Sequence, residues 1–251
     1  MTPYFWLTGG LLRRIALNWH GMGSRSRDQG AVPAPAAPGA GPVHRQPGIA
    51  SALLVLLASL LFTGLVLSFD QLRMVQAARS YGPAAVQGVA AWQEMFQIAR
   101  AKAESGRLTT VNDFFNSRIR FADDIIVWQQ NDYWATPLET FAKGAGDCED
   151  FAIAKYLTLL ASGIPAKRLR LVYVRAVTRG VDGATKLVPH MVLAYYPKAD
   201  SEPLILDNLI NEIQPASSRS DLRPLFSFNT EGIWEQVGSK SSTVSLDRLS
   251  R

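Results

Sequence analysis

Cysteine and histidine are scarce in this chain, and beyond residue 48 positive and negative side chains nearly balance. The 251 residues contain one cysteine and three histidines, and they show no internal repeat. A single cysteine excludes an intrachain disulfide. The formal net charge is +5, but residues 1–48 hold five arginines against one aspartate, which leaves +1 for the remaining chain. No basic stripe or base-stacking module remains to indicate a nucleic-acid partner.

A long apolar run stands in contrast to these absences. Residues 49–69 (IASALLVLLASLLFTGLVLSF) are 21 residues without a charge, enough for a helix to span the roughly 30 Å hydrocarbon core of a membrane. The run is long and apolar all round for a buried core helix. We predict a transmembrane anchor or a signal segment, and a cleaved signal peptide stays open. Because the flank before the run is basic, the residues after it are expected to be exported.

The remaining chain divides into segments of different composition. Residues 1–48 are basic and rich in proline, alanine and glycine, and we predict that this head is disordered. Residues 70–238 are expected to form one domain, and residues 239–251 a polar C-terminal tail. In an exported protein, a lone cysteine indicates an intermolecular disulfide or a reactive thiol.

Helical spacing in the first part of the domain gives way to alternating strands in the second. Apolar residues recur at helical spacing over 84–104, and Thr136-Pro137-Leu138-Glu139 is a capping box with proline at the first helical position. Helices before an antiparallel sheet predict an α+β fold. The expected helices cover 84–104, 110–120 (with Thr109 or Thr110 as N-cap), a short segment from Pro137, and 148–161; the expected strands cover 168–178, 186–196, 203–208, 225–228 and 233–237.

The cysteine lies between acidic neighbours in GAGDCEDFAIAKYL. Asp147 precedes Cys148, and Glu149 and Asp150 follow it. A helix N-terminus favours a thiolate, but three carboxylates raise the pKa of the thiol. The acids can be explained as helix caps, with Asp147 as N-cap. Alternatively they bind a hard divalent cation such as Ca²⁺, which removes the penalty. We expect Asp147 and Glu149 as ligands, with Asp150 a further candidate.

His190 is the one histidine expected in the exported domain, because His20 and His44 lie in the head. A hairpin turn centred on Lys198–Ala199 would place His190 opposite Asp207. An aspartate in this place can fix the imidazole tautomer and stabilise imidazolium. A nucleophile at a helix start, with base and orienting acid on adjacent strands, is the papain-type arrangement. A buried structural cysteine with an unrelated strand histidine is the alternative. A slip of one residue would put Asp207 on the wrong face.

Several separated motifs resemble a known family. RFADDIIVWQQNDYWATPLE, GAGDCEDFAIAKY, GIPAKRLRLVYV, PHMVLAY and LILDNL occur in this order. Together they resemble the bacterial transglutaminase-like cysteine proteinases, and among them the LapG-type periplasmic proteases, over roughly residues 70–238. The resemblance implies a papain-like, transglutaminase-like core with N-terminal helices packed on an antiparallel sheet. It implies a catalytic triad of Cys148 as nucleophile, His190 as general base and then acid, and Asp207 as orienting residue.

The resemblance also implies a substrate, a cofactor and a regulator. The substrate is the N-terminal region of a large surface adhesin, cleaved beside paired alanines, so that the adhesin is released and a biofilm disperses. The cofactor is calcium, bound by the acids beside the cysteine. The inhibitor is a LapD-like inner-membrane receptor for cyclic di-GMP, which sequesters the protease in the periplasm.

Other functions remain open on the same fold. A transglutaminase or other acyltransferase would use the same nucleophile, and a non-catalytic exported binding module could keep the fold alone. For the oxyanion hole we expect the backbone N–H of Cys148, with a second donor from residues 131–134. Tyr133 and Trp134 are equally well explained as wall or core aromatics.

Overall fold

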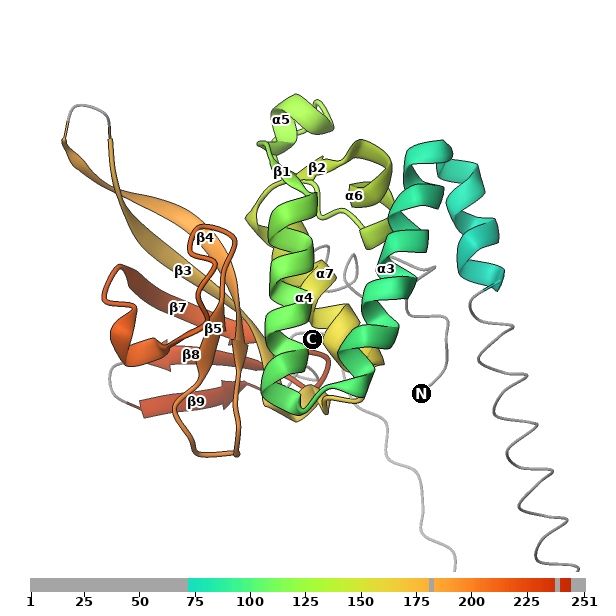
Figure 1. Cartoon of the computed structure of the whole chain (residues 1–251). Coiled ribbons are helices and arrows are strands. Elements are labelled where there is room, and N and C mark those ends of the chain that lie inside the picture. The colour runs from blue at the N-terminus through green and yellow to red at the C-terminus, as the bar shows by residue number, and fades with distance from the viewer. Residues whose placement is uncertain (1–71, 181–182, 238–239, 245–251) are drawn as a thin grey trace, which may run out of the picture.

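The helices of this chain cluster on one side of an antiparallel sheet (Figure 1). The structure, a computed structural model, describes residues 72–180, 183–237 and 240–244. Helices come before strands along the chain, which confirms the predicted α+β class. The predicted head (1–48) and apolar run (49–69) lie outside the described residues. Among the described residues, no helix is long and apolar enough to cross a membrane.

The segment that showed helical spacing in the sequence forms the helix α3 (Pro83–Ala101). In α3, Val89, Trp92 and Met95 are buried, so the expected apolar stripe is confirmed. The helices are a segment at 72–81, α3 (Pro83–Ala101), α4 (Glu104–Arg118), α5 (Asp124–Val127), α6 (Pro137–Lys143) and α7 (Cys148–Ala161).

The predicted start of α4 was wrong by six residues. The helix begins at Glu104 after Ala103, and no side chain caps it. The hydroxyls of Thr109 and Thr110 donate to carbonyls four residues back, at 3.3 and 2.7 Å, as threonines inside a helix do. A threonine that could cap a helix was therefore an interior residue, and the sequence pattern does not distinguish the two.

The capping box of α6 is confirmed, and it leads the chain to the cysteine. The Thr136 side chain accepts a hydrogen bond from the backbone N–H of Glu139, and the Glu139 carboxylate accepts one from the backbone N–H of Thr136. The helix stops at Gly144, whose φ of 60° is left-handed. The next two residues form β2 (Ala145–Gly146), which pairs in parallel with β1 (Arg120–Phe121). Because α7 starts at Cys148, this two-residue strand fixes where the cysteine begins its helix.

Within the described part of the chain, the large sheet has seven strands in the order β6-β5-β4-β3-β7-β8-β9, and all neighbours are antiparallel. The five predicted strands are present. β9 lies within residues 239–251, which we predicted to be a polar tail, so the sheet extends to Val244. The strands are β3 (Leu169–Arg179), β4 (Thr185–Tyr195), β5 (Leu204–Leu206), β6 (Gln214–Pro215), β7 (Leu222–Phe228), β8 (Ile233–Val237) and β9 (Lys240–Val244).

α7 is the central element of the core. It packs against β3, β4 and α4, and every residue from Asp150 to Leu159 is buried. Its apolar side chains share one cluster with Leu171 of β3 and with Met191 and Leu193 of β4. A helix apolar on all sides must be covered on all sides. The packing therefore holds the N-terminus of α7 beside β4, which carries His190.

Candidate functional site

Cys148 opens α7 and is half-buried. Asp147 occupies the N-cap position with an extended backbone, but its side chain makes no capping hydrogen bond. Helix capping therefore does not explain the Asp147 carboxylate. The helix N-terminus still offers its backbone N–H groups and macrodipole to the thiol.

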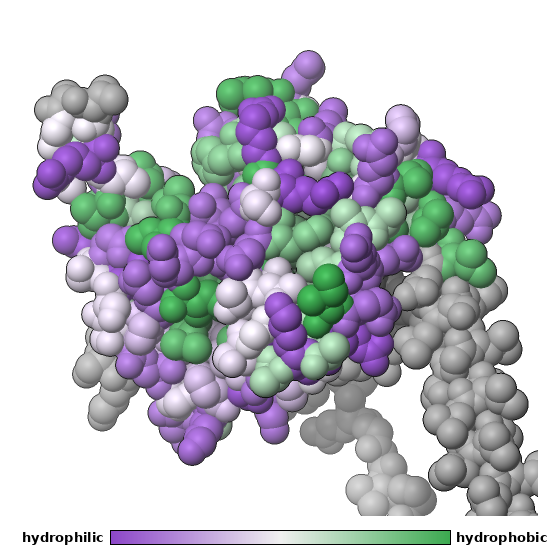
Figure 2. Space-filling view, viewed as in Figure 1, coloured by the Kyte–Doolittle hydropathy of each residue, from purple (hydrophilic) through white to green (hydrophobic). Residues whose placement is uncertain are grey.

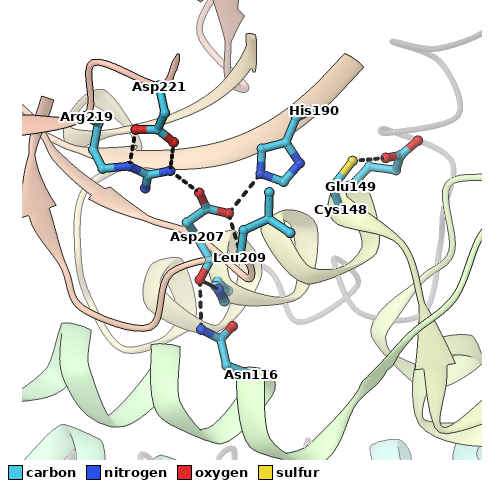
Figure 3. A network of polar contacts seen from close by, with 9 residues as sticks. Asn116, Cys148, Glu149, His190, Asp207, Leu209, Arg219 and Asp221 are labelled. Carbon is cyan, nitrogen blue, oxygen red and sulfur yellow. Dashed lines mark hydrogen bonds and ion pairs between the residues drawn. The ribbon is translucent and has the colours of Figure 1, made fainter. Parts of the chain in front are cut away.

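His190 and Asp207 come together from two neighbouring parts of the sheet. Nε2 of His190 lies 2.8 Å from Oδ1 of Asp207, and both side chains are buried. The imidazole ring lies between the carboxylate of Asp207 and the thiol of Cys148 (Figure 3). With Nε2 engaged by Asp207, Nδ1 is the nitrogen that remains for the thiol.

The predicted hairpin register was wrong by two residues. Leu193 lies opposite Leu206 and Tyr195 opposite Leu204, so the same register places Asp207 opposite Val192 rather than His190. Because side chains alternate with a period of two, a shift of two keeps the same face. His190 and Asp207 then meet as diagonal neighbours, which long side chains can bridge.

The Asp207 carboxylate is held on both of its oxygens. Besides the imidazole, Oδ1 accepts from the backbone N–H of Leu209 at 3.0 Å. Oδ2 accepts from Nη2 of Arg219 at 2.7 Å. Burial alone would raise the pKa of Asp207, but the hydrogen bond and charge of His190, followed by Leu209 and Arg219, lower it to about 2. The carboxylate is therefore ionised, as an orienting acid must be.

The backbone carbonyl of Asp207 is held as well. It accepts from Nζ of Lys155 at 3.0 Å and from Nδ2 of Asn116 at 2.7 Å. Lys155 lies two turns after Cys148 in α7, and burial lowers its pKa to about 7. The helix that begins at Cys148 thus also contacts the residue whose carboxylate binds the imidazole of His190.

The cysteine thiol is in an unfavourable electrostatic environment. It donates to Oε2 of Glu149 at 2.8 Å. Burial, then the charges of Glu149 and Asp147, raise the pKa of Cys148, and a hydrogen bond from the Met191 backbone opposes the shift. The structure therefore agrees with the expectation from the sequence that the neighbouring carboxylates raise the pKa of the thiol. Unless a positive charge offsets these acids, the site disfavours a thiolate.

Carboxylates from three segments converge beside Cys148. Ligand atoms of Asp124, Asp147 and Asp150 all lie within 4.8 Å of one another, as do those of Asp124, Asp132 and Glu149. Burial first, and then the neighbouring carboxylates, raise the pKa of Asp147 to about 9. Burial also raises the pKa of Asp124 to about 6 and that of Asp150 well above its ordinary value. So many buried acids without a cation are mutually destabilising.

Each of these aspartates keeps an oxygen free for a shared ligand. The Tyr133 backbone N–H donates to Oδ2 of Asp124, and the Ala135 N–H donates to Oδ1 of Asp150 at 2.8 Å. The opposite oxygens, Oδ1 of Asp124, Oδ2 of Asp150 and Oδ1 of Asp147, are buried without a hydrogen-bond partner. Three carboxylates that approach within 4.8 Å of one another, each with an unpartnered oxygen, fit a hard cation that takes oxygen ligands.

Asp124 and Asp132 were not predicted as ligands. α5 buries Asp124, which is 3% exposed, and leaves Ile125 and Ile126 at 55% and 69%, so that hydrophobic surface gathers over α5 (Figure 2). This reverses the usual preference of charged and apolar side chains. The acidic residues of RFADDIIVWQQND were a signal in the sequence, but only the fold shows that they reach Cys148.

The aromatic residues of the 131–134 segment have structural partners. The Trp134 ring stacks on Phe228 at 5.8 Å, and its indole N–H donates to Asp132 at 3.0 Å. The Tyr133 hydroxyl donates to Glu139 at 2.8 Å. Because the Tyr133 backbone N–H is engaged by Asp124, it is not free as the second oxyanion donor.

This chain is similar to known proteins in sequence and in fold. A family model described as "Bacterial transglutaminase-like cysteine proteinase BTLCP" matches residues 85–239. A solved structure of Legionella pneumophila LapG is 39% identical, with a TM-score of 0.57 over 67% of this chain and 89% of that one. The EGTA-treated form is 37% identical (TM-score 0.59, 71% and 91% covered), and the calcium-bound form is 38% identical (TM-score 0.59, 71% and 96% covered). Among curated proteins none matches.

Proposed function

Because the chain belongs to the bacterial transglutaminase-like cysteine proteinases, we propose that it is a calcium-dependent endopeptidase of the periplasm. Its substrate is the N-terminal region of a large surface adhesin, cut beside paired alanines, so that cleavage releases the adhesin and promotes biofilm dispersal. The observation that carries the proposal is the buried His190–Asp207 pair beside a cysteine that opens a helix.

The proposed reaction is acyl transfer followed by hydrolysis. His190 accepts the thiol proton at Nδ1, and the Cys148 sulfur attacks the substrate carbonyl carbon. The Cys148 backbone N–H donates to the oxyanion. His190 then gives its proton to the leaving amine as the C–N bond breaks. A water molecule, deprotonated by His190, attacks the thioester and restores the thiol, while Asp207 stabilises each imidazolium.

Calcium dependence rests on the carboxylate cluster. Asp124, Asp147 and Asp150 would hold the ion with their unpartnered oxygens, and Asp132 and Glu149 lie in the same cluster. A bound calcium ion would supply positive charge that offsets the acids around the thiol. Glu149, which accepts from the thiol here, would then have another partner. A relative was solved as both an EGTA-treated and a calcium-bound form.

Regulation and location extend the proposal by likeness to LapG. A LapD-like inner-membrane receptor, loaded with cyclic di-GMP in the cytoplasm, would sequester the protease in the periplasm. The apolar run at residues 49–69 would export the domain or anchor it to the inner membrane. Pull-down of the receptor's periplasmic domain on immobilised protease tests the first point, and N-terminal sequencing of the mature protein tests the second.

Cleavage of a candidate adhesin N-terminus, with and without calcium, tests the enzyme directly. We expect two fragments with wild-type protein in calcium, and no cleavage after chelation until excess calcium is added. Cys148→Ala should abolish cleavage in calcium. Fragments formed by Cys148→Ala at the wild-type rate would refute the proposal, and a joined product in place of fragments would identify a transglutaminase.

A further inference from the structure

We propose that Arg219 is a positioning residue, which fixes the Asp207 carboxylate in the orientation that His190 requires. The inference rests on the proposed function only in taking Cys148, His190 and Asp207 as one reacting unit. Arg219 follows the short 3-10 helix η3 (Ala216–Ser218), far along the chain from α7. No motif of the sequence pointed to it.

Arg219 connects two carboxylates. Nη2 lies 2.7 Å from Oδ2 of Asp207 and 2.7 Å from Oδ2 of Asp221, and Nε lies 2.9 Å from Oδ1 of Asp221. The Arg219 side chain is 1% exposed, against 35% for that of Asp221. Two nitrogens of the guanidinium thus donate to Asp221, and one of them, Nη2, also donates to Asp207 (Figure 3).

The backbone around Arg219 is held as well. The Arg219 N–H donates to the carbonyl of Ala216, and the Leu222 N–H donates to the carbonyl of Arg219, both at 3.0 Å. Leu222 begins β7, so the turn that carries the arginine is joined to the sheet. The donor that faces Asp207 is therefore supported on its backbone as well as on its side chain.

The geometry shows why this donor matters for the histidine. Oδ1 of Asp207 receives His190 and Leu209, and Arg219 is the partner of Oδ2. Without Arg219, Oδ2 would be a buried charged oxygen with no donor, and the carboxylate would turn to find one. Turning moves Oδ1 away from the imidazole, and a small misplacement of a catalytic group costs much of the rate.

The same contact could serve stability alone, because removing one partner of a buried ion pair is strongly destabilising in any fold. A lysine separates the two roles at this position. It keeps the charge but has no planar fork, so it cannot hold both carboxylates in the same way. Arg168 provides a matched control, since its guanidinium makes a two-pronged contact with Glu104 at 2.8 and 3.0 Å.

The test compares Arg219→Lys and Arg168→Lys in calcium. The rate of alkylation of Cys148 by iodoacetamide reports the thiolate without any peptide substrate, and kcat and KM are measured on the adhesin fragment. We expect Arg219→Lys to slow alkylation and lower kcat by about tenfold with KM unchanged. Arg168→Lys should leave both rates at the wild-type value even where thermal unfolding shows an equal loss of stability.

Asp221→Asn serves as a second variant, because it keeps Arg219 and weakens the hydrogen bonds that hold the guanidinium in place. We expect alkylation slowed by about threefold, and this variant decides the matter if Arg219→Lys does not fold. Alkylation at the wild-type rate in every folded Arg219 or Asp221 variant overturns the proposal. If wild-type protein cleaves no adhesin but Arg219→Lys still slows alkylation, the proposed substrate is wrong and the positioning role stands.

Discussion

Two aspartates of this site have pKa values shifted in opposite directions because different groups face them. Asp207 receives His190, Leu209 and Arg219, and its pKa falls to about 2. Burial, together with the facing carboxylates of Glu149 and Asp150, raises the pKa of Asp147 to about 9. Both are aspartates, and burial raises the pKa of each, so the opposite directions come from the partners. The first arrangement favours an anion beside a histidine, and the second fits a bound cation.

Asp207→Asn should lower stability in a pH-dependent manner. The folded pKa of about 2 lies below the ordinary value of 3.8, so the carboxylate stabilises the fold above pH 4, by about 2 kcal/mol. This contribution is lost as pH falls from about 4 through 2. Urea unfolding of both proteins in calcium-free buffer from pH 6 downward measures it. A difference that stays constant across this range would contradict the low pKa.

At the level of elements, the start of α7 combines the proposed nucleophile with the proposed ion site. The chain leaves α6 at Gly144, pairs as β2, and enters α7 within two residues of Gly146. A Cβ on Gly146 would lie 2.4 Å from Oδ2 of Asp150. Glycine is therefore required here so that the chain can pass the carboxylate.

Gly146→Ala should weaken calcium binding by at least about tenfold, because the methyl group displaces an oxygen that faces the ion site. Calorimetric titration with calcium measures the affinity. Gly144→Ala is the matched control: its Cβ meets nothing within 4 Å, but its φ is +60°. It should lower stability by about 1 kcal/mol and leave the affinity unchanged. Equal affinities in both variants and wild type would argue against Asp150 as a ligand.

At the level of the whole molecule, the carboxylate cluster joins segments that are separate in the chain. Asp124 comes from α5, Asp132 from the following loop, and Asp147, Glu149 and Asp150 from the start of α7. An ion at this point would tie the loop segments to the central helix. The folded state alone brings these acids together, so binding should stabilise it as a whole.

Calcium should therefore raise the unfolding temperature. At an ion concentration of about 100 times Kd, the folded state gains about 2.7 kcal/mol, which corresponds to roughly 5–10 °C for a domain of this size. Thermal unfolding followed by circular dichroism, with calcium and with chelator, measures the shift. Asp124→Asn should reduce it, while Asp113→Asn, at an acid of α4 outside the cluster, should keep it. An unchanged midpoint in calcium would contradict an ion site.

The sequence predicted most elements because their signals are local. The Thr136–Glu139 capping box, the α7 helix from Cys148 and the alternation of β3 all depend on neighbours within a few residues. The α4 start failed because Thr109 is compatible with both a cap and a helix interior. The prediction of the hairpin register was wrong because the sequences of two strands do not determine the length of the turn that connects them.

What the sequence determined by itself is the chemistry available: one thiol, one histidine in the expected exported domain, and acids on both sides of the thiol. What only the tertiary structure decided is which distant groups complete that chemistry. Asp124 and Asp132 join the acids of α7, and Arg219 and Lys155 hold Asp207, through contacts between residues that local patterns cannot relate. Charges act over a few ångströms of space whatever their separation in the chain, so their partners become known only when the fold is known.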